Sequence, residues 1–215
     1  MIQEVLYLKQ IEEFEKHSIV EANEVHVSAL VQCPMKWFYR FKYPDLARAQ
    51  QYHAYMILGK LVHMGLQSLL MSLDNSEFKV IGVEVEAAKS INIERNGMPL
   101  VVRIKGRADM IIEDSQGRVI VEIKTARGDY NMPLQHHELQ LRIYMNMLRA
   151  KRGLLLYITP DRIAEYPVDK PLDDYELQRL VYEFYQRSKT PKFDWECQYC
   201  QFNILCPMKK VNSRR

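Results

Sequence analysis

The sequence lacks the features that would place the chain in a membrane or direct it to export. No apolar run approaches the roughly 20 residues that a membrane-spanning helix needs. The N-terminus reads Met1-Ile2-Gln3-Glu4 and soon Glu12-Glu13-Phe14-Glu15, so it has neither the cationic nor the apolar region of a signal peptide. These absences predict a soluble, cytoplasmic protein with no membrane partner.

Excess charge of one sign, internal repeats and low-complexity stretches are lacking too. The net charge is only +3, so a surface that binds nucleic acid would have to come from local clusters of Lys and Arg. Hydrophobic residues make up 47% and charged residues 27% of the chain, as in an ordinary globular protein. The 215 residues are enough for a single large domain, 1–215, with a real core.

The periodicity of apolar residues predicts helices first, then strands, then an alternation of both. Residues 1–20 are expected to form a strand and a short helix, and Ser28 is expected to cap the helix that carries Cys33 and the aromatic residues 37–41. Further helices are predicted at 54–73, 134–150 and 173–188, and strands at 78–94, 100–113, 118–125, 154–159 and 163–168. This order predicts an α/β fold in which helices flank a mixed or mostly antiparallel central sheet.

Acidic residues interrupt two of these otherwise apolar strands. A buried charge costs several kcal/mol unless it is paired or binds a metal, so their positions are informative. If the hairpin is centred on Ser115-Gln116, Asp109 lies opposite Glu122, and Lys124 shares their face. The opposite face is then wholly apolar, with Ala108, Met110, Ile112, Val119, Val121 and Ile123.

Two opposed carboxylates repel each other, and a divalent cation such as Mg²⁺ or Mn²⁺ would resolve the conflict. Lys124 could then orient an attacking water and stabilise charge on a phosphate. The alternative from spacing alone is a salt bridge between Lys124 and one of the acids on a solvated face. The continuation of that face with Ile111 and Ile120 argues against this alternative.

The four cysteines are poor candidates for disulfides in a reducing compartment. Cys33 stands alone near the start, whereas Cys197, Cys200 and Cys206 crowd the end. Such a set offers four thiolates, which suits either an iron–sulfur cluster or a structural zinc, and the spacing does not separate the two.

Taken together, these residues resemble the RecB-like branch of the restriction-endonuclease superfamily. That pattern has a helical His, an Asp on one strand, (D/E)-x-K on the next and Q-x-x-x-Y on the following helix. It is matched in order by His63, Asp109, Glu122-Ile123-Lys124 and Gln140-Leu141-Arg142-Ile143-Tyr144.

The resemblance implies a restriction-endonuclease-like core in which His63, Asp109, Glu122 and the backbone carbonyl of Ile123 bind the metal. Lys124 would be the catalytic lysine, and Gln140 and Tyr144 would support the site. Glu84 or Glu86 could also face the metal, although a solvated strand edge suits both.

One cysteine before the core and three after it resemble the iron–sulfur staple of RecB-like nucleases. With this chain length, the resemblance narrows to the CRISPR-associated exonuclease family, number four in that series. It implies that Cys33, Cys197, Cys200 and Cys206 hold a cluster, [4Fe–4S] in preference to [2Fe–2S]. Segments 24–50 and 190–208 would form a small cap around the cluster, joining the N- and C-terminal parts, and 209–215 would be a basic tail.

Basic and aromatic residues interleave close to Cys33. Aromatic rings can stack on bases and Lys or Arg can neutralise phosphates, so DNA contacts are predicted at Lys36, Trp37, Tyr39, Arg40 and Lys42. The alternative is that Trp37 belongs to the core and the charges form a solvated helix face.

The function predicted from the sequence is a metal-dependent DNA exonuclease that acts on ends, single-stranded or frayed. The resemblance implies that it processes DNA fragments for insertion into a CRISPR array, beside the integrase proteins, and it leaves a homo-oligomer open. The alternative function is a cluster-bearing subunit that binds DNA ends with little or no nuclease activity. A redox protein is a third alternative, but it would leave the carboxylate–lysine set unexplained.

Overall fold

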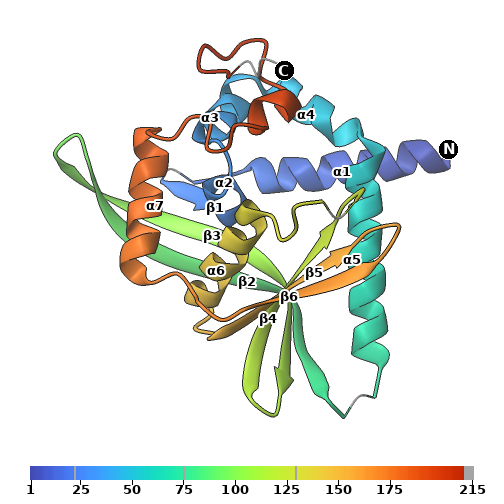
Figure 1. The fold of residues 1–215 in the computed structure, drawn as a ribbon. Helices are drawn as coiled ribbons and strands as arrows, with labels where there is room; N and C mark the ends of the chain where they lie inside the picture. Colours follow the sequence, from blue (N-terminus) through green and yellow to red (C-terminus); the bar gives the residue numbers. More distant parts are fainter. Residues whose placement is uncertain (22, 75, 129, 211–215) are drawn as a thin grey trace. The chain divides into compact units, whose positions relative to one another are not determined.

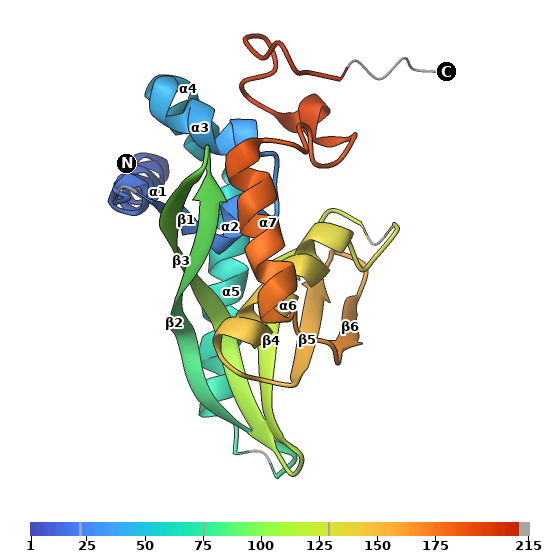
Figure 2. The same ribbon diagram turned by 90° about the vertical axis from the view of Figure 1, so that its left-hand side faces the viewer.

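The computed structural model describes residues 1–21, 23–74, 76–128 and 130–210 (Figures 1 and 2). The helices are α1 (Ile2–Ser18), α2 (Val27–Leu30), α3 (Pro34–Lys42), α4 (Pro44–Ala49), α5 (Ala54–Ser72), α6 (Gln135–Met147) and α7 (Asp174–Gln186), with 3₁₀ turns η1 (Gln50–Tyr52) and η2 (Glu196–Tyr199). The strands are β1 (Glu24–His26), β2 (Phe78–Arg95), β3 (Met98–Asp114), β4 (Gly117–Thr125), β5 (Arg152–Ile158) and β6 (Ile163–Val168).

A single mixed sheet organises the strands of the described chain. Its order is β1-β3-β4-β5-β6, and β2 also pairs with β3. The β3–β4 and β5–β6 pairs are antiparallel, whereas β4 and β5 run parallel. Within β3–β4, Met110 lies opposite Val121 and Asp114 opposite Gly117, which is the register expected from a turn centred on Ser115-Gln116. The predicted α/β fold with a mixed sheet is therefore confirmed.

Two compact units share the chain. The first contains residues 1–57, 91–103 and the described residues from 178 onward, and the second contains 58–90 and 104–177. The two segments expected to form the cluster cap, 24–50 and 190–208, fall in the first unit. The residues expected to form the active site fall in the second. Residues 211–215 of the expected basic tail lie outside the described residues.

Both faces of the sheet in the second unit are covered by helices. On one face, Leu66 and Leu70 of α5 pack on a buried cluster of Met110, Val119, Val121, Ile123 and Leu156. This is the strand face predicted to be wholly apolar. Helix α6 packs on β4 and β5 (Figure 2), and it approaches β5 closely because Gly153 has no side chain. The face that carries Glu122 and Lys124 is therefore covered by α6.

Most predicted elements agree with the structure within a few residues, but two local predictions at the N-terminus are wrong. Residues 2–18 form one helix and not a strand followed by a helix. Ser28 does not cap the helix that carries the aromatic residues: it lies inside the four-residue α2, which follows His26. That longer helix, α3, begins at Pro34 with Cys33 as its N-cap. Proline suits the first position of a helix, because a backbone N–H at that position has no acceptor within the helix and its absence costs nothing.

Helix α5 also departs from the expectation that no apolar run is long enough to cross a membrane. By length and composition alone, its 19 residues could do so, and just 6% of its most apolar stretch is buried. Leu58, Leu61 and Met64 are all more than half exposed on it. Its opposite side contributes to the second unit, because Leu66 packs on the sheet core there.

Two glycine-to-alanine substitutions are expected to change stability in opposite directions. A Cβ at Gly153 would lie 2.7 Å from Met145 Sδ and 2.9 Å from Leu141 Cγ, whereas a Cβ at the helical Gly65 would have no neighbour within 4 Å. We expect Gly153→Ala to lower the free energy of unfolding by about 1–3 kcal/mol through overpacking. Gly65→Ala should raise it by about 0.5–1 kcal/mol. Urea denaturation of both variants measures the difference, and equal shifts would contradict the packing of α6 on β5.

Candidate functional site

Asp109 stands at the end of the regular β3–β4 ladder. Its Oδ2 accepts the backbone N–H of Ile123 at 2.7 Å, and its Oδ1 lies 3.4 Å from Nδ1 of His63 on α5. The β3–β4 backbone pairing ends at Met110 with Val121, and beyond it the Asp109 carboxylate accepts the N–H of Ile123 in place of a backbone carbonyl. This fixes the Asp109 side chain between the two strands with little freedom to rotate.

Glu122 is the most buried charged group of the site, with a side chain that is 2% exposed. Its Oε1 accepts from Lys124 Nζ at 2.7 Å and from Gln140 Nε2 at 2.7 Å. Lys124 Nζ also donates to Gln140 Oε1 at 3.0 Å. The other carboxylate oxygen of Glu122, Oε2, is buried without a hydrogen-bond partner among the described residues. Burial raises the pKa of Glu122, although the charge of Lys124 opposes the shift. The salt bridge to Lys124 thus exists, but in a buried site and not on a solvated face.

The two remaining residues of the predicted site also lie here. Burial acts to lower the pKa of His63, but its hydrogen bond and charge interaction with Asp109 outweigh that effect and raise it. Tyr144 is buried on α6, and its Oη accepts the backbone N–H of Arg107 at 3.3 Å. Burial raises the pKa of Tyr144 above its ordinary value, so the phenol stays protonated. The structure therefore brings together His63, Asp109, Glu122, Lys124, Gln140 and Tyr144 in the second unit.

Sequence reasoning missed Gln67, which lies one helical turn after His63. The Gln67 side chain is buried, and its Nε2 donates to the backbone carbonyl of Asp109 at 2.8 Å and to Glu84 Oε1 at 3.0 Å. Glu84 has a φ of 51°, which is uncommon for a residue with a side chain, and it also pairs with Arg107. Helix α5 therefore holds Asp109 at two points, the carboxylate through His63 and the backbone through Gln67. The spacing of four residues is the signal that could have identified it.

The donor set suits a hard divalent cation. Two carboxylates and an imidazole are ligands that Mg²⁺ or Mn²⁺ accepts, and the buried Glu122 Oε2 is an acceptor that still lacks a partner. In the described chain, no three His, Cys, Asp or Glu side chains converge into a ready-made metal site. Mg²⁺ does not require one, since it is usually held by one or two carboxylates and keeps several waters. The ligand role of the Ile123 carbonyl stays a prediction.

The four cysteines are free and half-buried, and all lie in the first unit. Cys200 interacts electrostatically with Cys33, Cys197 and Cys206, so the four thiols occupy one neighbourhood, although they do not converge as a preformed site. Burial raises the pKa of the Cys33 thiol to about 11 and also raises that of Cys200. Burial thus favours the protonated form of these two thiols.

A second feature that the sequence did not reveal joins the N- and C-terminal segments. Glu196 is buried, and its carboxylate accepts the backbone N–H groups of Cys33 at 2.7 Å, Lys192 at 2.8 Å and Phe193 at 2.9 Å. The Lys192 ammonium in turn donates to the carbonyl of Leu30. Figures 1 and 2 show the C-terminal segment beside α3 in both views. Residues of the chain itself therefore link the segments that the cysteines were expected to join.

The residues expected to contact DNA lie on α3, with differing surroundings. Trp37 is buried, and its ring contacts His26, Phe41 and the guanidinium of Arg40. The Tyr39 ring packs against Tyr43 and Phe202. The ammonium of Lys42 lies over the Tyr43 ring, and that of Lys36 donates to Gln32 at 2.9 Å. Trp37 thus belongs to the core, as the alternative interpretation held, and DNA contact by the others stays a prediction.

Comparison with known proteins agrees with this geometry. The model of the PD-(D/E)XK nuclease superfamily matches residues 71–207. The matched range contains Asp109, Glu122, Lys124, Gln140 and Tyr144, and His63 precedes it.

The chain is 42% identical over 210 residues to a protein described as CRISPR-associated exonuclease Cas4 from Saccharolobus solfataricus, covering 97% of this chain and 99% of that one. It also superposes with a TM-score of 0.87 on a solved structure described as the crystal structure of SSO0001. The two chains are 41% identical, and the match covers 98% of each.

Replacing the buried amide on α5 should impair the site without touching the predicted metal ligands. We expect Gln67→Leu to lower the free energy of unfolding by about 1–3 kcal/mol, because two acceptors lose their donor. It should also reduce metal-dependent nuclease activity by about 10–100-fold and raise the Mg²⁺ concentration for half-maximal activity. The control is Ser68→Ala, at an exposed position of the same helix. Unchanged Mg²⁺ dependence would show that Gln67 only packs.

The link made by Glu196 should also stabilise the protein independently of any metal. Glu196→Ala leaves three backbone N–H groups without their acceptor, so we expect the free energy of unfolding to fall by about 1–3 kcal/mol in metal-free protein as well. Thermal unfolding with and without bound metal measures this effect, with Glu165→Ala as the exposed control. A destabilisation that occurs only in metal-loaded protein would contradict the metal-independent link.

Proposed function

Because this chain belongs to the CRISPR-associated exonuclease Cas4 family within the PD-(D/E)XK nucleases, we propose that it hydrolyses DNA from strand ends at the site around Asp109 and Glu122. Membership of these families makes it a metal-dependent nuclease. Action on single-stranded or frayed ends is the finer part of the proposal.

The observation that carries the proposal is the half-satisfied carboxylate of Glu122. A buried acceptor without a partner costs about 1–3 kcal/mol, and a structural role would not require Oε2 of Glu122 to remain unpaired. Asp109, the other carboxylate of the pair, is held by Ile123 N–H and His63. The chain thus holds the carboxylates of Asp109 and Glu122 in fixed orientations and leaves Oε2 of Glu122 without a partner. A divalent cation needs such carboxylate oxygens as ligands.

Each residue of the site has a role that follows from its contacts. Asp109, Glu122 and His63 would hold one or two divalent ions, which when bound supply Lewis-acid activation of water and phosphate. Lys124 is held by Glu122 and Gln140 with its side chain 17% exposed, so its ammonium can approach a phosphate and stabilise the charge that develops there. Gln140 orients both Glu122 and Lys124, and Tyr144 supports the β3 backbone at Arg107. In the reaction, a water oxygen bonds to phosphorus, a P–O ester bond breaks and the leaving oxygen gains a proton.

We also propose that Cys33, Cys197, Cys200 and Cys206 hold an iron–sulfur cluster, with [4Fe–4S] favoured over [2Fe–2S]. Their free, half-buried thiols in one neighbourhood support this, as does the C-x₂-C spacing. The cap would then comprise residues 24–50 and 190–208. A brown protein with visible absorption would support the cluster, whereas a colourless, zinc-containing protein would favour the structural zinc.

The CRISPR context supports a role in preparing DNA fragments for insertion into an array, beside the integrase proteins. This part rests on the name of the Cas4 relative. The second candidate, a DNA-end-binding subunit with little nuclease activity, has less support because Asp109, Glu122 and Lys124 are all present: Lys124 bonds Glu122, and Asp109 bonds the backbone N–H of Ile123 between them.

The test uses anaerobically purified protein with 5′- and 3′-labelled DNA, single- and double-stranded, in Mg²⁺, Mn²⁺ or EDTA. We expect metal-dependent degradation that EDTA abolishes and that Asp109→Ala and Lys124→Ala each reduce on the order of 10²–10³-fold. The two labels give the polarity of digestion. Lys151→Ala, at an exposed position, is the matched control for Lys124. Intact DNA in every lane, from folded and cluster-loaded protein, would favour the end-binding subunit.

A further inference from the structure

An ion pair between β2 and β3 lies beside the candidate active site in the second unit. Glu84 Oε2 contacts Arg107 Nε at 2.5 Å. Arg107 comes two residues before Asp109 on β3, so the two side chains share a face of the strand, and its backbone N–H donates to Tyr144 Oη. Gln67 donates both to Glu84 Oε1 and to the carbonyl of Asp109. A continuous series of contacts therefore connects Arg107 with Asp109.

The backbone of β2 is shaped around Glu84. Its φ of 51° is unfavourable for a residue with a side chain, and such conformations concentrate at functional sites. The bend beside it is tight, because a Cβ at Gly82 would lie 2.7 Å from Val85 Cγ2. The side chains of Arg107 and Glu84 are 50% and 37% exposed, and an ion pair so exposed adds little stability. Stability alone thus does not account for the placement of this carboxylate.

The carboxylate of Glu84 is used differently from that of Glu122. Both oxygens of Glu84 have partners, since Oε1 accepts from Gln67 and Oε2 contacts Arg107. In Glu122, by contrast, Oε2 has no hydrogen-bond partner among the described residues. Glu84 is therefore built as an anchor for Arg107, whereas Glu122 keeps an acceptor for a cation.

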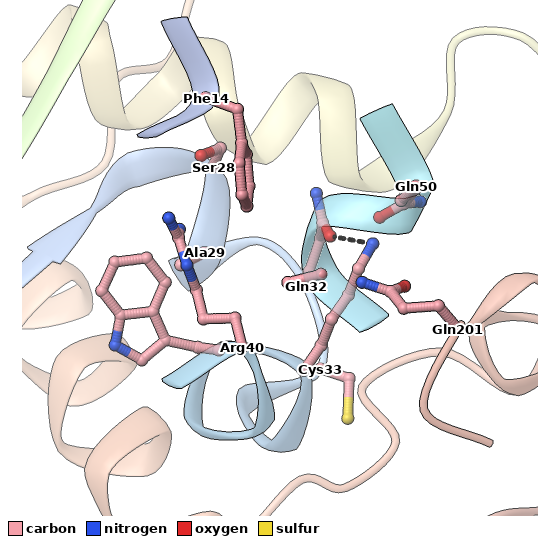
Figure 3. A pocket seen from close by; sticks show the side chains of 11 residues that line it. Phe14, Ser28, Ala29, Gln32, Cys33, Arg40, Gln50 and Gln201 are labelled. Atoms are coloured by element: carbon pink, nitrogen blue, oxygen red, sulfur yellow. Dashed lines mark hydrogen bonds between the residues drawn. The ribbon is translucent and has the colours of Figure 1, made fainter. Parts of the chain in front are cut away.

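Other arginines of the described chain are held in other ways. Arg152 bonds Asp114 through both of its Nη groups, so its terminal fork is used within the chain. Arg40 lines a pocket of the first unit that has no acidic lining residue, and its guanidinium lies over aromatic rings (Figure 3). Arg107 meets Glu84 through Nε. A guanidinium held in this way keeps its Nη edge for a second acceptor.

A phosphate of the DNA strand is an acceptor that fits this edge, because two phosphate oxygens match the planar fork of arginine. We propose that Arg107 binds a backbone phosphate beside the catalytic site and that Glu84 positions its guanidinium, a proposal that rests on the proposed function. Residues two apart on a strand are separated by about 6.8 Å, so Arg107 reaches a phosphate other than the one that faces Asp109. Glu84 also keeps the guanidinium from neutralising Asp109 in place of a cation.

The test measures binding in EDTA, where no cleavage occurs, by fluorescence anisotropy. A labelled oligothymidylate of 12 nucleotides carries one neutral methylphosphonate at successive linkages. We expect several linkages to matter in the native protein and Arg107→Met to abolish the effect at just one of them. Arg107→Met should bind the unmodified strand about 10-fold more weakly. It should also reduce the slope of log K against log salt by about 0.7, and Arg107→Lys should restore that slope. Arg118→Met, at an exposed position on β4, is the matched control.

The positioning role of Glu84 has its own variant. Glu84→Gln keeps an acceptor for Gln67 but removes the charge that holds Arg107. We expect the sensitive linkage to be replaced by weaker effects spread over its neighbours, because the guanidinium then reaches more than one phosphate. Glu94→Gln, at an exposed position of the same strand, should keep the native profile. A native profile in Glu84→Gln would overturn the positioning role.

Steady-state kinetics separates a phosphate contact from a bracing role. A contact made equally in the ground state and the transition state raises KM and leaves kcat unchanged. We therefore expect Arg107→Met to raise KM about 10-fold with kcat within about 2-fold. A brace that acts on Asp109 through Glu84 and Gln67 predicts a lower kcat and a lower melting temperature instead. That result, or a methylphosphonate profile that Arg107→Met leaves unchanged, would overturn the proposal.

This proposal and the proposed function fail separately. Metal-dependent nuclease activity with an unchanged methylphosphonate profile in Arg107→Met would remove the phosphate contact and leave the nuclease intact. Loss of one sensitive linkage in Arg107→Met, in a protein that degrades no DNA, would support the contact and remove the exonuclease.

Discussion

The burial of the Glu122 carboxylate is the constraint on which the site depends. A carboxylate that is 2% exposed must be paired to stay ionised. Among the described residues, Lys124 and Gln140 pair one of its oxygens and none pairs the other. Lys124 is fixed in turn because its ammonium neutralises Glu122. Gln140 is fixed because its amide bonds both Glu122 and Lys124. The position of α6 on the sheet, set by the missing side chain at Gly153, is therefore a condition for Lys124 to be oriented.

The same constraint explains why α5 holds Asp109 at two points. Asp109 and Glu122 repel each other unless a cation lies between them, so the cation-free protein must oppose that repulsion with its own contacts. His63 and the Ile123 N–H hold the Asp109 carboxylate, and Gln67 holds its backbone. Glu84 then takes up the second hydrogen bond of Gln67. Its unusual backbone conformation is thus part of the support of the site, and the sequence could not reveal it because a left-handed residue within a strand has no pattern.

The sequence predicts a helix or strand well where its apolar residues repeat at regular spacing and form one buried face. Strands β2, β3 and β4 and the register of Met110 with Val121 follow from alternation and a short turn, since a slip of one residue would place Asp109 and Glu122 among the apolar side chains. Helix α1 was missed because its apolar residues do not form a buried face: Ile2, Val5 and Leu8 are exposed and Ile11 is buried. The start of α3 was misplaced because Pro34, and not Ser28, begins the helix. Glu196 escaped notice because an acid that bonds backbone groups far along the chain leaves no local signature, whereas Gln67 was missed although it lies four residues after His63 on the same helix.

Glu196 changes the physical role expected for the cysteines. A metal that joins residue 33 to residue 206 would close nearly the whole chain into one loop, and by analogy with disulfides that could stabilise it by about 4–5 kcal/mol. That figure assumes that nothing else holds the loop closed. Glu196 already bonds the Cys33 backbone to Lys192 and Phe193, and Lys192 bonds Leu30. Because the chain closes this junction itself, a metal bound by the cysteines adds less stability than the loop length implies.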